Sequence, residues 1–379
     1  MTSRPSRPSS HPADRQRCPR PRLGTRLARP RVVGPLVWLA VHLAIAACPP
    51  QATAQGRDRV VVSQPDKPGR LTHVGDITEY NAVELVISAR GRSQPWRIPL
   101  KRIVSVTPVR SQHHHAALEQ LKHNQTDLAE RSFRKALQTA SKKWVRRELL
   151  AGLVRCALRS GDYRQAGAHF LNLTEGTTKS RHVSLVPLDW RTQGTVDAAV
   201  ASEARAWLGR GSDIATLLAC SHLLRDSAYS REAETQLRRL RISTDSQVRG
   251  LAVAQCWRAD LRSETPTPKM LDSWTRHVLS LPVEFRGGAW YVVGRARFQR
   301  RQLEPAAAAL MWTSLTCRDD RFLAAQATQF AADALLGDNQ PAAAQTLYRD
   351  LRRRFAGTPA ARESATSPKT PPTTRRNSK

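Results

Sequence analysis

Asn124-Gln-Thr-Asp-Leu-Ala129 and Gly161-Asp-Tyr-Arg-Gln-Ala166 are the two stretches that decide the fold of this chain. Each lies between two amphipathic stretches, and each is followed, four residues after its alanine, by a phenylalanine, Phe133 or Phe170. A unit of two helices and a turn therefore recurs at a spacing of 37 residues. Repeats of this length are typical of solenoids, in which neighbouring units bury a shared core and leave a long surface for partners.

The helical period continues to the end of the apolar sequence. It predicts six helix pairs and one further helix, at residues 113–139, 143–174, 196–226, 229–262, 267–300, 303–336 and 339–355. We therefore expect a mainly α fold, with an α-solenoid of helix hairpins over residues 111–357. Residues 358–379 are rich in proline and almost free of apolar side chains after Ala361, which predicts a disordered tail.

The segment before the helices has the strand period of two. Val60 and Val62 alternate with polar residues, and several similar runs follow, separated by turn-forming residues. Gly75 interrupts one run and predicts a bulge or a sharp bend. Five short strands in about fifty residues favour a small twisted barrel over residues 55–110. The strand count and Gly75-Asp-Ile77 resemble SH3-like or Sm-like barrels.

A fixed spacing of large, small and aromatic residues recurs in the helical part. Trp290, Gly294, Ala306 and Leu310 have this spacing in full. Partial matches are Ala117, Ala129 and Phe133; Leu150, Ala166 and Phe170; and Ala344 and Tyr348. The pattern resembles the tetratricopeptide repeat (TPR) family, in which small residues let two helices approach and aromatic residues fill the gap to the next hairpin. The resemblance implies a protein–protein interaction or scaffold function.

The chain is strongly basic. It has 61 Lys and Arg against 31 Asp and Glu, a net charge of +30, and only ten of the basic residues are Lys. Nucleic-acid binders are often rich in both basic residues, whereas so steep a bias toward Arg is also what a GC-rich genome gives. We favour solvated basic helix faces, with binding of a nucleic acid or another polyanion as the alternative.

The first 54 residues have the organisation of a secretory signal peptide. An Arg-rich stretch precedes the uncharged run Val32–Cys48, and Ala52-Thr-Ala54 forms a cleavage site of the small-x-small type. Residues 1–54 are therefore predicted to be a basic region and signal peptide, and the protein to be exported to the periplasm or cell envelope. Two alternatives stay open. Ile45-Ala-Ala-Cys48 resembles a lipobox, which would lipidate Cys48, and the uncharged run has the length of a single membrane anchor.

No catalytic, cofactor or metal site is predicted, so we do not expect an enzyme. The chain contains no Gly-x-Ser-x-Gly, no phosphate-binding glycine loop and no Cys-x-x-Cys. Cys156, Cys220, Cys256 and Cys317 lie in apolar helical contexts and are expected to be core residues. We expect residues 113–115, three histidines, to form a linker, since adjacent helical positions point about 100° apart and cannot share one ion. The acidic pair at 319–320 predicts a helix start.

Two features are candidates for binding an unidentified protein or peptide. Lys143, Trp144 and Arg147 place basic and aromatic groups together, although a solvated helix start with its Trp in the core is the commoner arrangement. Residues 175–194, which include Trp190, form a long connection that we expect to pack on the helices as an extended strap, with a partner-binding loop as the alternative. We expect an exported scaffold that docks a peptide or helix on a concave face. Alternatives are a polyanion binder and an accessory subunit of an envelope enzyme.

Overall fold

The computed structural model describes residues 56–64, 69–89, 91–176 and 180–366. The predicted signal peptide, the lipidation candidate Cys48 and the possible membrane anchor lie outside the described residues. Within the described ranges, none of the helices has the length and apolar character needed to cross a bilayer.

The N-terminal part is an antiparallel sheet with strand order β4-β3-β2-β1-β5. The strands are β1 (Asp58–Ser63), β2 (Arg70–Tyr80), β3 (Glu84–Ser88), β4 (Trp96–Pro99) and β5 (Ile103–Thr107), with a 3-10 turn, η1 (Leu100–Arg102), before β5. The long strand β2 pairs with β1 up to Gly75 and with β3 beyond it. A Cβ atom at Gly75 would clash with the carbonyl oxygen of Ser88, so only glycine fits this close approach. The predicted five strands are confirmed. The irregularity predicted at Gly75 lies instead between Ile77 and Glu79, where the register of β2 against β3 shifts.

The helices are, in order, α1 (Gln112–Lys122), α2 (Thr126–Thr139), α3 (Lys143–Ser160), α4 (Tyr163–Thr174), α5 (Ala198–Leu208), α6 (Asp213–Leu223), α7 (Ser230–Leu240), α8 (Ser246–Ser263), α9 (Pro268–Ser280), α10 (Arg286–Gln299), α11 (Leu303–Thr316), α12 (Arg321–Gly337), α13 (Pro341–Arg354) and α14 (Pro359–Thr366). The six predicted pairs and the single helix after them are confirmed. Two predictions are wrong. The three histidines begin α1 instead of forming a linker, because Ser111 caps that helix by accepting a hydrogen bond from the His114 amide. Residues 359–366 of the predicted tail form α14, because Ala360 and Ala361 pack into a core with α12 and α13.

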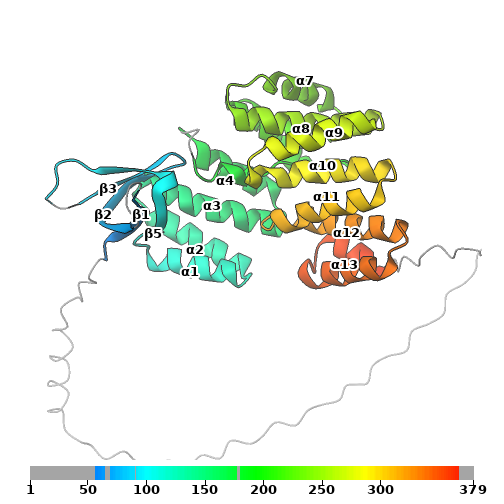
Figure 1. Ribbon diagram of the computed structural model, residues 1–379. Coiled ribbons are helices and arrows are strands. Elements are labelled where there is room, and N and C mark those ends of the chain that lie inside the picture. The colour runs from blue at the N-terminus through cyan, green and yellow to red at the C-terminus, as the bar shows by residue number, and fades with distance from the viewer. Residues whose placement is uncertain (1–55, 65–68, 90, 177–179, 367–379) are drawn as a thin grey trace, which may run out of the picture. The chain divides into compact units, whose positions relative to one another are not determined.

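Consecutive helices pack against each other, as Figure 1 shows for α10 to α13. Small residues make the close contacts. A Cβ atom at Gly294 in α10 would lie 2.6 Å from Cγ of Leu310 in α11. Gly152 in α3 lies against the ring of Phe133 in α2 in the same way. Gly294, Leu310 and Phe133 of the spacing pattern therefore lie at helix contacts where neither glycine can be replaced by a larger residue without a clash.

The sheet and the helices share a core. Trp144 at the start of α3 is buried with Val60, Ile77 and other side chains of the sheet, and its indole Nε1 donates a hydrogen bond to the Ile77 carbonyl at 2.8 Å. Beside it, Arg147 Nη1 lies 3.0 Å from Glu79 Oε1. The described residues from Gly56 to Thr366 form a single compact unit.

One contact joins helices that are far apart in the sequence. Arg155 and Arg159 of α3 form ion pairs with Asp319, with N–O distances of 3.2 and 2.9 Å. The Tyr163 hydroxyl donates to Asp320, which also caps α12 by accepting a hydrogen bond from the Leu323 amide. The predicted helix start at the acidic pair is confirmed, and the same pair joins α12 to α3 and α4. The array is therefore more than a chain of nearest-neighbour contacts.

The connection between α4 and α5 packs on the helices, so the predicted strap is confirmed for residues 180–194. It contains a short 3-10 turn, η2 (Val183–Leu185). Trp190 is buried, and its indole ring occupies the space that a side chain at Gly288 in α10 would need. Next to it, Asp189 is only 1% exposed and lies between α6 and α8.

Candidate functional site

A basic groove is built from α7, α8 and α9. The C-terminal end of α7 leads through a short turn into α8. Asp245 caps α8, and its carboxylate accepts hydrogen bonds from the Gln247 and Val248 amides. The end of α9 approaches the first turns of α8 closely. A Cβ atom at Gly250 would lie 2.5 Å from Cδ2 of Leu281, so the glycine lets the two helices meet and form one wall of the groove.

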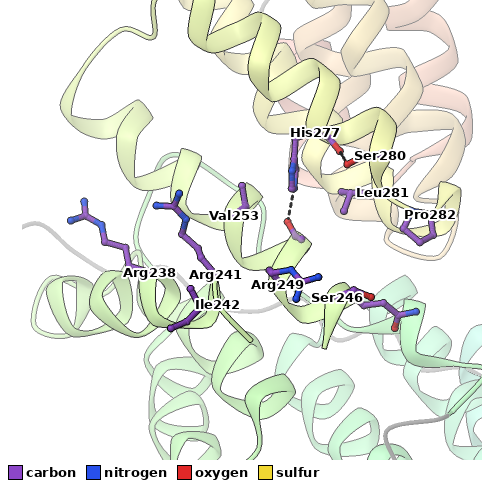
Figure 2. A pocket seen from close by; sticks show the side chains of 12 residues that line it. Arg238, Arg241, Ile242, Ser246, Arg249, Val253, His277, Ser280, Leu281 and Pro282 are labelled. Carbon is purple, nitrogen blue, oxygen red and sulfur yellow. Dashed lines mark hydrogen bonds between the residues drawn. The ribbon is translucent and has the colours of Figure 1, made fainter. Parts of the chain in front are cut away.

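The groove has a volume of about 760 Å³. Its lining residues are Arg238, Arg241, Ile242, Ser246, Gln247, Arg249, Gly250, Val253, His277, Ser280, Leu281 and Pro282. Figure 2 shows Arg238 and Arg241 on one side, His277, Leu281 and Pro282 on the other, and Arg249 and Val253 between them. The lining thus includes three guanidinium groups and no carboxylate, so the groove attracts anions.

The three arginines differ in how far the chain itself neutralises them. Arg238 forms an ion pair with Glu234, one turn earlier on α7. Arg249 donates from Nη1 to the carbonyl oxygen of Ser243 at 2.7 Å, a neutral partner that leaves the charge uncompensated. Arg241 is exposed, and its side chain has no hydrogen-bond or ion-pair partner among the described residues, although the Asp260 carboxylate in the adjoining cavity interacts with it electrostatically. An arriving anion therefore finds two guanidinium groups, those of Arg241 and Arg249, that form no ion pair with a carboxylate, with Asp260 acting on Arg241 only from a greater distance.

His277 is held in place. Its Nε2 lies 3.0 Å from the Gly250 carbonyl oxygen, and its ring meets the edge of Trp257 at a centroid distance of 5.4 Å. Ser280 donates from its hydroxyl to the His277 carbonyl at 2.7 Å. The contacts of His277 with Gly250 and Trp257 hold the end of α9 against α8, so we assign His277 to the shape of the groove.

A second cavity of about 290 Å³ adjoins the groove and shares Arg241, Val253 and His277 with it. Trp257 and Trp274 stack on each other there, with ring centroids 4.9 Å apart and planes at 9°. They are 6% and 5% exposed, so each ring is used to pack α8 against α9. Groove and cavity together therefore offer arginine side chains, the carboxylate of Asp260 and apolar surface, but no open ring face.

A second group of charged side chains, centred on Asp189, is buried between the strap and the helices. Burial alone would raise the pKa of Asp189, but the guanidinium groups of Arg191, Arg258 and Arg225 hold that pKa well below its usual range. Arg225 Nε donates to Asp189 at 2.7 Å, and Arg258 donates to the carbonyl oxygens of Arg191 and Ser221. These hydrogen bonds and ion pairs hold the strap against α6 and α8. We therefore assign the cluster a structural role.

The cysteines are not placed as nucleophiles. Those in the described residues are free thiols, buried except for the half-buried Cys317, as predicted. Burial raises the pKa of Cys156, Cys220 and Cys317 to about 12 and that of Cys256 to about 11. A thiol with such a pKa is almost entirely protonated at neutral pH and reacts slowly.

The partner-binding residues predicted from the sequence do not lie in the groove. Trp144 and Arg147 contact the sheet, and Trp190 contacts α10, so all three side chains already have partners within the chain. Lys143 is exposed at the start of α3. Lys143, Trp144 and Arg147 all lie in the first turns of α3, whereas Trp190 lies in the strap against α10. Their role in binding a partner stays a prediction.

Sequence reasoning missed the groove. The available signal was the run of arginines at 238, 239, 241 and 249 around a helix end, within a region whose repeat pattern is weak. Arginine is so frequent in this chain that the run does not stand out. A scan of the sequence against protein-family models finds no match, and neither does a comparison with characterised proteins.

Proposed function

We propose that this chain is a non-enzymatic interaction or scaffold protein of the periplasm or cell envelope, built on a TPR-like array of helix hairpins. The observation that carries the proposal is the groove between α7, α8 and α9, which is open and basic and has a volume of about 760 Å³. The close contact of α10 with α11 at Gly294 supports the likeness to TPR hairpins, since that family depends on small residues at such contacts. The five-stranded sheet is the SH3-like or Sm-like part of this proposal.

The environments of the cysteine thiols and of two aspartate carboxylates favour an interaction function over catalysis. Burial raises the pKa of the thiols, and the buried carboxylate of Asp189 and the half-buried carboxylate of Asp320 have structural partners. Helical repeats expose long surfaces, and their partners commonly bind by laying a peptide or helix into a groove.

Binding of a nucleic acid or another polyanion is the second candidate. The net charge of +30 favours it. The burial of Trp257 and Trp274 argues against a single-stranded nucleic acid in the groove, because such sites usually stack bases on accessible rings. A polyanion complex would weaken steeply as salt concentration rises. The third candidate, an accessory subunit of an envelope enzyme, would copurify with one defined enzyme.

Site-specific photo-crosslinking tests the proposal in cells. Gln247, which lines the groove, is replaced by p-benzoylphenylalanine, and Arg131 on α2 is replaced in the same way as the control. We expect one discrete adduct from the Gln247 position in the envelope fraction, with a partner that mass spectrometry identifies and that binds the purified chain. Absence of any adduct at Gln247, or the same adducts from both positions, would count against the proposal. Intact mass tests export: cleavage after Ala54 gives a chain that begins at Gln55, whereas a diacylglyceryl mass on Cys48 identifies a lipoprotein.

A further inference from the structure

One exposed aliphatic side chain lines the groove, and two more belong to residues next to its lining in the sequence. Ile242, in the turn between α7 and α8, is 83% exposed, and Leu279 near the end of α9 and Val283 just after it are 54% and 61% exposed. Ile242 lines the groove itself, and the other two flank the lining residues Ser280 and Pro282. Scattered exposed apolar residues are normal on a protein surface, but an exposed Ile242 in the lining, with Leu279 and Val283 next to lining residues, adds apolar contact to a basic groove.

The charges disfavour a second copy of this chain as the occupant. The groove presents Arg238, Arg241 and Arg249 without a carboxylate in its lining. The chain as a whole carries a net charge of +30, so two copies repel each other. The groove therefore fits a partner that brings negative charge.

We propose that the groove binds a segment of a partner protein in which Asp or Glu side chains alternate with aliphatic ones. The carboxylates bind Arg241 and Arg249, with Arg238 adding charge beside its pair with Glu234. The aliphatic side chains of the segment cover Ile242, Leu279 and Val283. This inference rests on the proposed interaction function and names the chemistry of its partner.

The shape of the site favours a polypeptide over the other anionic macromolecules. A chain segment can enter the recess between three helices and reach the Arg249 side while its apolar side chains lie on the rim. A lipid bilayer is flat on this scale and would touch the protruding rim but not the recess. A single-stranded nucleic acid gains much of its affinity from base stacking, and the two tryptophans next to the groove are stacked on each other.

Fluorescence anisotropy with the full chain tests the proposal. The probe is a labelled peptide of about twelve residues that alternates Glu and Leu, a length that can cross the groove. Three comparison probes are a poly-Glu peptide of equal length, a single-stranded DNA and vesicles of anionic lipid. We expect saturable binding of the alternating peptide, about tenfold weaker binding of poly-Glu, and weakening of both as salt screens the charges.

Two sets of variants locate the binding. Arg238→Gln, Arg241→Gln and Arg249→Gln together should weaken the alternating peptide at least tenfold, and Ile242→Ser should reduce its advantage over poly-Glu. The matched control removes three exposed arginines elsewhere: Arg131→Gln, Arg210→Gln and Arg349→Gln. It lowers the net charge by the same amount and should leave the affinity nearly unchanged. Far-UV circular dichroism confirms that all variants are folded.

Several results would overturn the inference. These are absence of saturable peptide binding, equal losses in both triple variants, or tighter binding of DNA or vesicles than of the alternating peptide. If the peptide fails while the Gln247 adduct with a defined partner persists, only this inference is wrong and the interaction function stands. If both fail, the interaction function falls with it.

Discussion

Trp144 is the side chain that decides whether the sheet and the helices unfold together. It is buried in the core of the sheet although it belongs to α3, and its indole donates to the Ile77 carbonyl. Removing a buried Trp side chain typically costs about 3–5 kcal/mol, so we expect Trp144→Ala to lower the free energy of unfolding by that amount. Trp144→Phe keeps most of the apolar volume but removes the donor, and should cost about 1–3 kcal/mol.

The assay is guanidinium denaturation followed by two signals. Far-UV circular dichroism reports the helices, and hydrogen exchange at the Ile77 and Ile87 amides reports the sheet. Because Trp144 joins the two parts, both signals should shift to lower denaturant together in Trp144→Ala. The reasoning is refuted if the sheet loses protection while the helical transition stays where it is in the parent chain.

A truncated chain of residues 109–360 supplies the control. The sequence predicts that it stays folded and strongly helical, since each repeat contacts mainly its neighbours. Without the sheet, Trp144 has lost the partners that bury it, so Trp144→Ala should now cost far less than in the full chain. An undiminished cost would mean that α3, and not the sheet, provides the environment of this side chain.

Three further perturbations test other parts of the fold. Ala166 in α4 is fully buried, so Ala166→Leu should overpack the α3–α4 hairpin and cost about 1–3 kcal/mol; an unchanged melting temperature would contradict this hairpin register. Asp189→Asn should cost about 3–5 kcal/mol in denaturant titrations, because it leaves the guanidinium groups of Arg225 and Arg258 buried without a counter-charge, and a neutral result would show that they are solvated. Burial lowers the pKa of His222 from 6.5 to about 4, so the unfolded chain binds a proton that the folded chain does not, and this contribution to stability is lost as pH falls from 6.5 toward 4. Between pH 7 and pH 5 we expect His222→Gln to lose about 2 kcal/mol less stability than the parent chain, which denaturation at the two pH values measures.

Local patterns in the sequence predicted most of the helices and strands. The helical period placed the helix pairs, the two-residue period placed the five strands, and turn residues marked the boundaries between them. These signals are local because hydrogen bonds within a helix or hairpin join residues close in sequence. The same signals failed at residues 359–366, where two alanines are helical because of what they pack against. A short helix of this kind has no local signature strong enough to predict it.

The sequence by itself determined that this chain is a sheet followed by helix hairpins, since apolar spacing and small residues at fixed intervals specify both. Only the tertiary structure decided what the charged and aromatic residues do. Trp144 and Arg147 are as consistent in sequence with a binding surface as with a domain contact, and their burial against the sheet is a contact over more than sixty residues. The groove likewise combines the ends of α7 and α9 with the start of α8. Its charge is visible in the sequence, but its location depends on how three helices pack, and no local pattern encodes that packing.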